Sequence, residues 1–179
     1  MECIHPGNES GRPRNIGSRR VSNVIRRRPA VNIHHATRFA ERLGLPLQLA
    51  VTINFSLMGI PPELVVELFR TMLAQRFAPW LRRIPANKMG IPPTYVWVTE
   101  AAGGQQAVHW LLHLPYGLIS EFRGKLRTWL SAVSAEGRLP ERALKVQKVY
   151  NVIGVRRYIL KGTDPPWVPR RLPPQHFAA

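Results

Sequence analysis

The chain has 179 residues, of which 45% are hydrophobic, so it is long enough to form one domain with a hydrophobic core. Its 26 Lys and Arg residues against 10 Asp and Glu residues give a net charge of +16. Five of the basic residues are lysines and 21 are arginines, whose planar guanidinium groups bind phosphate through two hydrogen bonds. This excess favours nucleic acid as the partner, although coding bias in a GC-rich genome would also raise the arginine content.

Several classes of protein are excluded or disfavoured at once. Cys3 is the only cysteine, so one chain forms neither a disulfide nor a zinc site built on cysteines. No segment approaches the roughly 18 apolar residues of a membrane-spanning helix. The first residues contain no apolar stretch after their charges, so we expect no secretory signal, no membrane association and a cytoplasmic location.

The first 33 residues differ in composition from the remainder. They contain few large apolar side chains, four glycines and prolines between positions 7 and 17, and a run of arginines at 26–28. We expect residues 1–33 to form a disordered basic arm that follows DNA phosphates, with a solvated tail of no function as the alternative.

Alternating and helical patterns then define elements over residues 34–162, which we expect to form the folded domain. A short helix is expected over 35–43, a strand over 47–55, and a helix from Pro61 that ends at Pro79. The apolar stripe of that helix comprises Leu64, Val65, Leu68, Phe69, Met72, Leu73 and Phe77. Residues 82–93 are expected to be a loop.

A hairpin, two further elements and a tail complete the chain. Strands are expected over 94–100 and 107–114, joined by residues 101–106, and a helix over 118–133. Its apolar stripe comprises Leu118, Ile119, Phe122, Leu126, Trp129, Leu130 and Val133. A strand over 143–150 and a helix over 151–161 follow, with a strand as the alternative for the latter. Residues 163–179 are a proline-rich tail.

The order of these elements is β-α-β-β-α-β with a final helix. This order predicts an α+β fold of the ferredoxin-like kind, in which one antiparallel sheet is covered by helices on one face. Such a fold by itself does not define a function.

Polar side chains are expected to gather on the face of the sheet that the first two helices leave open. Side chains alternate along a strand, so Val108 and Trp110 take one face, and Ala107 and His109 take the other. If the hairpin pairs tightly, Glu100 lies directly across from Ala107, and His109 is its diagonal neighbour within side-chain reach.

A tyrosine far downstream completes the candidate site. Tyr158 and Lys161 are three residues apart, so they share one side of the expected final helix. A tyrosine hydroxyl attacks poorly at neutral pH unless a cation or a metal assists it. Carboxylate and imidazole ligands, here Glu100 and His109, suit Mg²⁺ or Mn²⁺.

These motifs over residues 47–162 resemble the HUH-type single-strand endonucleases, which include rolling-circle replication initiators and relaxases. Residues 51–55 look like the first motif of that family, Glu100 with positions 107 and 109 like its metal motif, and Tyr158 with Lys161 like its tyrosine motif. The resemblance implies Glu100 and His109 as metal ligands, Tyr158 as the nucleophile on a DNA phosphodiester, and Lys161 as the residue that orients the phosphate. The chain departs from the family at Ala107, where the family has a histidine.

The predicted partner is therefore single-stranded or hairpin DNA, bound and nicked in plasmid or phage replication or mobilisation. Two alternatives stay open: a DNA-binding module of the same fold without catalysis, and an RNA-binding or ribosome-associated protein. Basic residues outside the core stripes are the candidate contacts to nucleic acid: Arg123, Arg127, Lys148, Arg156 and Arg157.

Overall fold

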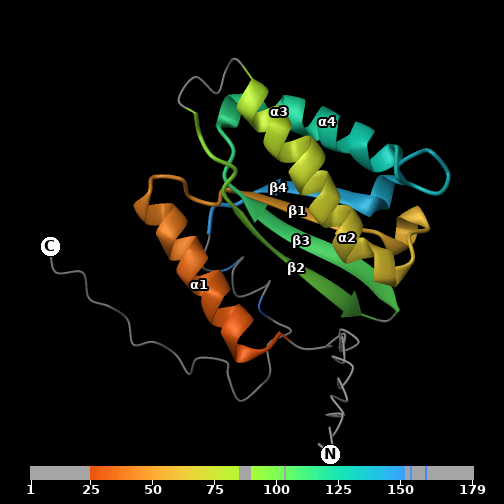
Figure 1. The fold of residues 1–179 in the computed structure, drawn as a ribbon, viewed down its shortest axis with the longest axis horizontal. Helices are drawn as coiled ribbons and strands as arrows, with labels where there is room; N and C mark the ends of the chain where they lie inside the picture. The colour runs from red at the N-terminus through yellow and green to blue at the C-terminus, as the bar shows by residue number, and fades with distance from the viewer. Residues whose placement is uncertain (1–24, 85–89, 103, 152–153, 155–159, 161–179) are drawn as a thin grey trace, which may run out of the picture.

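A computed structural model of the chain describes residues 25–84, 90–102 and 104–151, together with residues 154 and 160. The α+β class is confirmed: the described elements form one four-stranded antiparallel sheet with helices on both faces (Figure 1). The expected final helix lies almost wholly outside the described residues. The expected tail and residues 1–24 of the expected arm lie outside them as well.

The sheet has the strand order β2-β3-β1-β4, and every neighbouring pair is antiparallel. Its strands are β1 (Leu49–Asn54), β2 (Tyr95–Ala102), β3 (Gln105–Leu112) and β4 (Leu144–Lys148). The β2–β3 hairpin is regular throughout, from Tyr95 opposite Leu112 to Ala102 opposite Gln105. It turns at Gly104, whose φ of 76° lies in the left-handed region that glycine adopts without strain.

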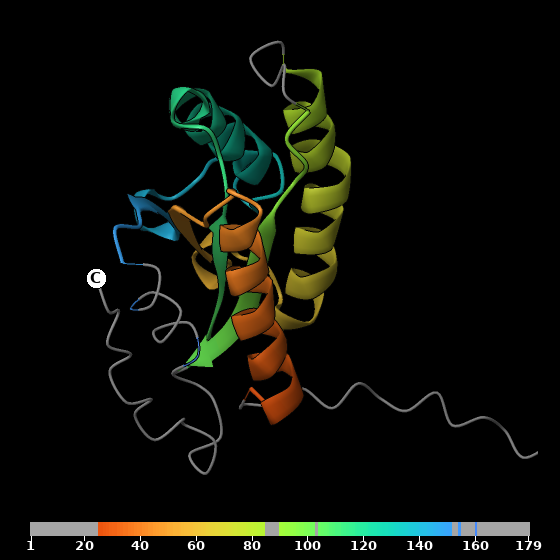
Figure 2. The same cartoon turned by 90° about the vertical axis from the view of Figure 1, so that its left-hand side faces the viewer.

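One face of the sheet carries the main hydrophobic core. Two helical segments cover this face: α2 (Pro62–Met72), continued by a π-helical turn (Leu73–Phe77) and α3 (Ala78–Arg83), and α4 (Ile119–Ser131) (Figures 1 and 2). The predicted apolar face of β3 is confirmed, because Val108, Trp110 and Leu112 are all fully buried in this core. Trp110 packs edge-on against Phe77 with ring centroids 4.9 Å apart, which is the preferred geometry of aromatic pairs.

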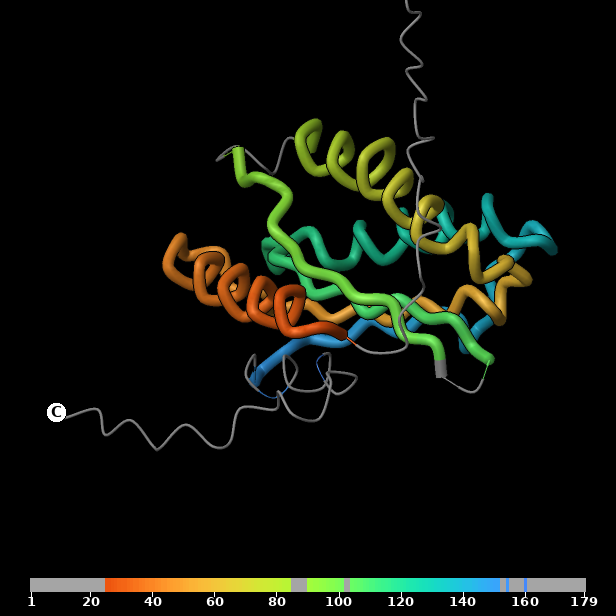
Figure 3. Tube along the Cα trace, turned by 60° about the horizontal axis from the view of Figure 1, so that its bottom comes forward, coloured from red at the N-terminus to blue at the C-terminus, as the bar shows by residue number. Residues whose placement is uncertain are grey.

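The opposite face is only partly covered. Helix α1 (Arg27–Arg42) packs there through a small cluster in which Ala40 and Leu47 contact Leu111 and Val149 (Figures 2 and 3). Figures 1 and 2 place the N-terminal end of α1 and the β2–β3 turn at the same end of the sheet. The cluster lies toward the other end, so the end near the turn keeps a polar surface.

The helices differ from the sequence expectations in three respects. Helix α1 begins at Arg27, inside the segment that we expected to be an arm, because Ala30, Ile33, Thr37 and Ala40 form a buried stripe at helical spacing. The second helical segment does not end at Pro79, because the π-helical turn precedes it and Pro79 occupies the first turn of α3.

Two residues of the expected apolar stripes are exposed, and this is the third difference. Leu64 in the first turn of α2 and Val133 beyond the end of α4 are 48% and 37% exposed. Leu64 lies on the solvent side of its turn, since its neighbour Val65 is fully buried, and Val133 follows the last residue of α4. No helix in the described part of the chain is long and apolar enough to cross a membrane.

Candidate functional site

The hairpin register brings an acid and an imidazole together. Glu100 on β2 is directly opposite Ala107 on β3, as the sequence predicted, and His109 is two residues further along β3. Since alternate residues share a face, Glu100 and His109 both lie on the face opposite the main core. Their side chains meet, with Nε2 of His109 2.6 Å from Oε2 of Glu100.

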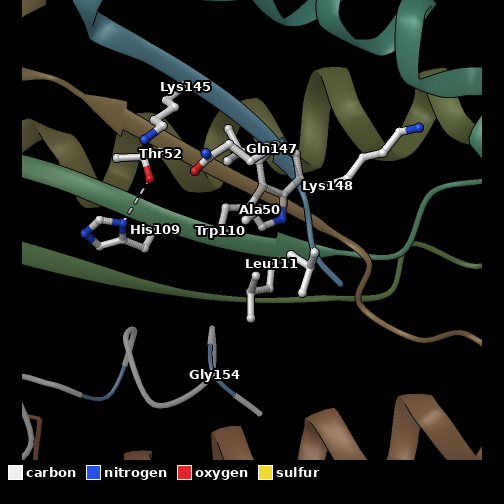
Figure 4. Close-up of a pocket in the computed structure, with 11 residues that line it drawn as sticks. Ala50, Thr52, His109, Trp110, Leu111, Lys145, Gln147, Lys148 and Gly154 are labelled. Carbon is white, nitrogen blue, oxygen red and sulfur yellow. Dashed lines mark hydrogen bonds between the residues drawn. The ribbon is translucent and has the colours of Figure 1, made fainter. Parts of the chain in front are cut away.

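A second contact fixes the other side of the imidazole ring. Thr52 on β1 is in register with His109, and its Oγ1 lies 3.1 Å from Nδ1 of the ring (Figure 4). The His109 side chain is only 9% exposed, whereas the Glu100 side chain is 28% exposed. The ring is therefore clamped between two strands, and the carboxylate lies on the solvent side of the pair.

The proton positions follow from the chemistry of the partners. An ionised carboxylate only accepts hydrogen bonds, so Nε2–H of His109 donates to Glu100, and Nδ1 of the neutral ring accepts the hydroxyl proton of Thr52. A hydroxyl also accepts, so Thr52 is an equally good partner for a ring protonated on Nδ1. Thr52 therefore suits either tautomer, whereas Glu100 suits only a ring that carries a proton on Nε2, unless a cation lies between the two groups.

The polar surface continues onto the other strands of this face. Lys145 on β4 is in register with Thr52, so the side-chain row runs from His109 through Thr52 to Lys145. Asn54, the next residue of β1 on this face, donates from Nδ2 to Oε1 of Gln105 at 3.1 Å. The expectation that polar groups of several strands gather on this face is confirmed.

A pocket of about 460 Å³ opens beside this row. Thr52, His109 and Lys145 line its polar end, Ala50, Leu111 and Val149 line its apolar end, and Gln147 lies between them on β4 (Figure 4). Gly154 faces the sheet from the other side of the pocket. The pocket is thus amphipathic and lies directly against the clamped histidine.

The other candidate residues are not gathered at this site. Arg123 and Arg127 lie on α4, which covers the opposite face of the sheet, and Arg123 donates from a terminal guanidinium nitrogen to the carbonyl of Val146 at 3.0 Å. Lys148 lies at the rim of the pocket, but its Nζ is 5.4 Å from the ring centroid of Tyr116 and extends away from His109 (Figure 4). Tyr158, Lys161, Arg156 and Arg157 lie outside the described residues.

The donor set for a divalent cation is small. Within the described residues, no three His, Cys, Asp or Glu side chains lie close enough together to hold a metal ion. Ala107 supplies no ligand, and Nδ1 of His113 lies 2.9 Å from the carbonyl oxygen of Pro46. A β-bulge beside the turn would direct Gln106 toward the site, but Gln106 pairs regularly with Ala101 and is buried.

Glu100 and His109 nevertheless fit Mg²⁺ or Mn²⁺ as a pair. Mg²⁺ typically keeps several waters and takes one or two protein ligands together with phosphate oxygens. Binding to Nε2 requires the ring proton to be on Nδ1, and Thr52 can accept it there. A cation bound in this way would depend on the phosphate of a bound ligand.

Sequence reasoning missed Lys145 and Gln147. Both alternate with the half-buried Leu144 and Val146 along β4, so their exposure was visible in the pattern. The position of Lys145 opposite Thr52 and of Gln147 opposite Ala50 became clear only when β4 was placed next to β1 in the sheet. Comparisons of the chain with protein-family models, with curated proteins and with solved structures each found no match.

Proposed function

We propose that the protein binds single-stranded or hairpin DNA on the polar part of the open sheet face and nicks it through Tyr158, in the manner of HUH-type endonucleases. The observation that carries the proposal is the contact between Glu100 and His109 on that face, since these two residues have the sequence spacing of the HUH metal motif. The strand order β2-β3-β1-β4, with a helix in each crossover connection, supports a ferredoxin-like arrangement of the kind that this family uses.

The charge of the surrounding elements supports an anionic ligand. Lys145 is exposed in the same cross-strand row as His109, on the other side of Thr52. Arg26, Arg27 and Arg28 are exposed where α1 begins, at the same end of the sheet as the hairpin turn. DNA phosphates would therefore meet cations on both sides of the Glu100–His109 pair.

The proposed reaction is a phosphoryl transfer. The hydroxyl of Tyr158 attacks the phosphorus of one phosphodiester, a 5′-phosphotyrosine bond forms, and the 3′-oxygen leaves and takes up a proton as a free 3′-hydroxyl. Mg²⁺ or Mn²⁺, when bound, supplies polarisation of the phosphate oxygens. Glu100 and His109 would hold that cation, and Lys161 orients the phosphate and neutralises its charge.

The test is formation of a covalent adduct. Purified protein is incubated with pooled labelled single-stranded DNA and Mn²⁺, and the products are separated on a denaturing gel. We expect a labelled protein band with the wild type, no band with Tyr158→Phe, and an undiminished band with Tyr150→Phe. Tyr150 is a suitable control because its side chain is 90% exposed. A labelled band that persists in Tyr158→Phe contradicts the assignment of the nucleophile.

A DNA-binding module without catalysis is the second candidate, and Ala107 favours it. With alanine opposite Glu100, one of the family's metal ligands is missing, and both ring nitrogens of His109 have hydrogen-bonding partners within the protein. This candidate predicts salt-sensitive binding of single-stranded DNA, no adduct with any sequence of the pool, and unchanged affinity in Tyr158→Phe.

The RNA-binding alternative receives less support from the sheet. RNA-recognition sheets stack bases on exposed aromatic rings of their central strands. Within the described strands, the aromatic residues are Tyr95, Trp97 and Trp110, and all three pack against the main core beneath the helices. Competition between DNA and RNA strands of matched sequence separates the two partners.

A further inference from the structure

The pocket beside His109 has the size and the polarity of a nucleotide site. Its volume of about 460 Å³ falls in the range of roughly 300–1,000 Å³ that is typical of small-ligand sites. Its two ends differ, with a hydroxyl, an imidazole and an ammonium group at one end and aliphatic side chains at the other. A nucleotide has the same division between an anionic phosphate and a flat, largely apolar base.

The sheet register determines how these ends are arranged. Cross-strand neighbours form two adjacent rows, one of His109, Thr52 and Lys145, and one of Leu111, Ala50 and Gln147. Successive residues on one face of a strand are about 7 Å apart, so the rows are separated by about the distance from a phosphate to its base. A phosphate on the first row therefore leaves its base on the second.

We infer that one nucleotide of the bound strand occupies this pocket, with its phosphate at Lys145 in the row of His109 and Thr52, and that Gln147 reads its base. The inference rests on the proposed DNA binding and adds a specificity subsite to it. Leu111 and Ala50 contact the face of the base, while the Gln147 side chain lies at its edge. Lys145 binds the phosphate of the same nucleotide.

The chemistry of Gln147 selects the base. A glutamine amide presents one donor and one acceptor, and this pair matches N7 and the N6 amino group of adenine. Guanine presents two acceptors, N7 and O6, on the same edge, so it matches a glutamine amide less well when that edge faces Gln147. For a base that turns its N7 edge toward Gln147, the pocket should therefore prefer adenine. The protein should then show the same base preference at the position beside the cleaved phosphate.

The experiment uses mononucleotides as probes and the full-length protein. Binding of dAMP, dGMP, dCMP and dTMP is followed by chemical-shift changes of backbone amides. We expect dAMP to bind most tightly, with the largest shifts at Ala50, Leu111 and Val149, and Gln147→Leu to lower its affinity about tenfold. Gln75→Leu, which alters an exposed residue on the opposite side of the sheet, serves as the control.

A second comparison tests the phosphate end. Lys145→Met should weaken dAMP and leave deoxyadenosine, which has no phosphate, unchanged, whereas Lys125→Met on α4 should affect neither. Equal dAMP affinity in the wild type, Gln147→Leu and Lys145→Met, or shifts centred elsewhere, would overturn the inference. If single-stranded DNA binds but dAMP does not, the inferred nucleotide subsite is wrong and the proposed DNA binding stands. If dAMP binds in the pocket but single-stranded DNA does not bind, the proposed function is wrong.

Discussion

Ala107 lies directly across the hairpin from Glu100 and on the same face as His109, so a histidine placed there would join the pair as a third metal ligand. We predict that Ala107→His raises the affinity for Mn²⁺ in the absence of DNA by about tenfold or more, since even outer-shell changes shift metal affinity by about 10- to 100-fold. Calorimetry with Mn²⁺ alone measures the effect.

The matched control is Ala101→His. Ala101 belongs to the same hairpin but lies on the opposite face of the sheet from Glu100, with the side chains of Tyr95 and Trp97. Ala101 is exposed and Ala107 is half-buried, so a histidine at position 101 adds the same group with at least as much access to the ion and should leave Mn²⁺ affinity unchanged. An equal increase in Mn²⁺ affinity in both variants would show that the added imidazole binds the ion without Glu100.

Thr52 supplies the hydrogen bond that holds the inner nitrogen of His109. We predict that Thr52→Val lowers the free energy of unfolding by about 1 kcal/mol, because Nδ1 then loses its partner in a half-buried position. Thr52→Ser retains the hydroxyl, so its free energy of unfolding should fall by less than that of Thr52→Val. Strand propensity alone would predict the opposite order, because valine favours strands more than serine does. Urea unfolding gives the comparison, and a Thr52→Val protein as stable as the wild type would disprove a structural role for this contact.

At the scale of elements, the loop after β1 is held by a close approach to the end of α4. Gly59 has a φ of 71°, and a Cβ built on it would lie 2.9 Å from Cβ of Ala135. The backbone N–H of Ala135 donates to the carbonyl of Met58 at 3.0 Å, which keeps the two segments together. The glycine is therefore required by both backbone conformation and space.

Two glycine substitutions should act in opposite directions. We predict that Gly59→Ala costs about 2 kcal/mol or more, since the left-handed conformation alone costs an alanine about 1–2 kcal/mol. Gly124→Ala should stabilise the protein by about 0.5–1 kcal/mol, because Gly124 lies inside α4 and a Cβ there meets no atom within 4 Å. Thermal unfolding of the two variants gives the signs, and a loss of stability in Gly124→Ala contradicts this account of α4.

The sequence predicted the elements that have strong periodicity, together with the register of the hairpin. The pairing of Glu100 with Ala107 followed from strand alternation and a short turn, because both are local properties. The continuation of the second helical segment past Pro79 was not predictable from propensity, since a π-helical turn and the burial of Leu81 override the proline. The proximity of His109 to Glu100 was predicted from the sequence, but the contact of His109 with Thr52 was not. These two residues are 57 positions apart, and only the pairing of β1 with β3 brings them together.

At the scale of the whole molecule, the net charge of +16 should dominate binding of DNA. Four arginines of the N-terminal segment, Arg12, Arg14, Arg19 and Arg20, precede the described residues. If all four contact phosphates, replacing them by glutamine should make the slope of log affinity against log salt concentration shallower by about 2.8, at about 0.7 per contact with single strands. Titrations at several salt concentrations measure the slope, and an unchanged slope excludes the segment from the interface.

The hydrogen bond from Arg123 to the carbonyl of Val146 lies at the edge of the sheet and bears on whether molecules of the protein associate through that edge. β4 is an edge strand of the described sheet, and edge strands expose backbone groups that can pair with strands of another molecule. The guanidinium occupies one of these carbonyls and places a positive charge beside it. We therefore expect Arg123, which the sequence offered as a DNA contact, to disfavour pairing of this edge with a strand of another molecule and so to reduce aggregation at high concentration.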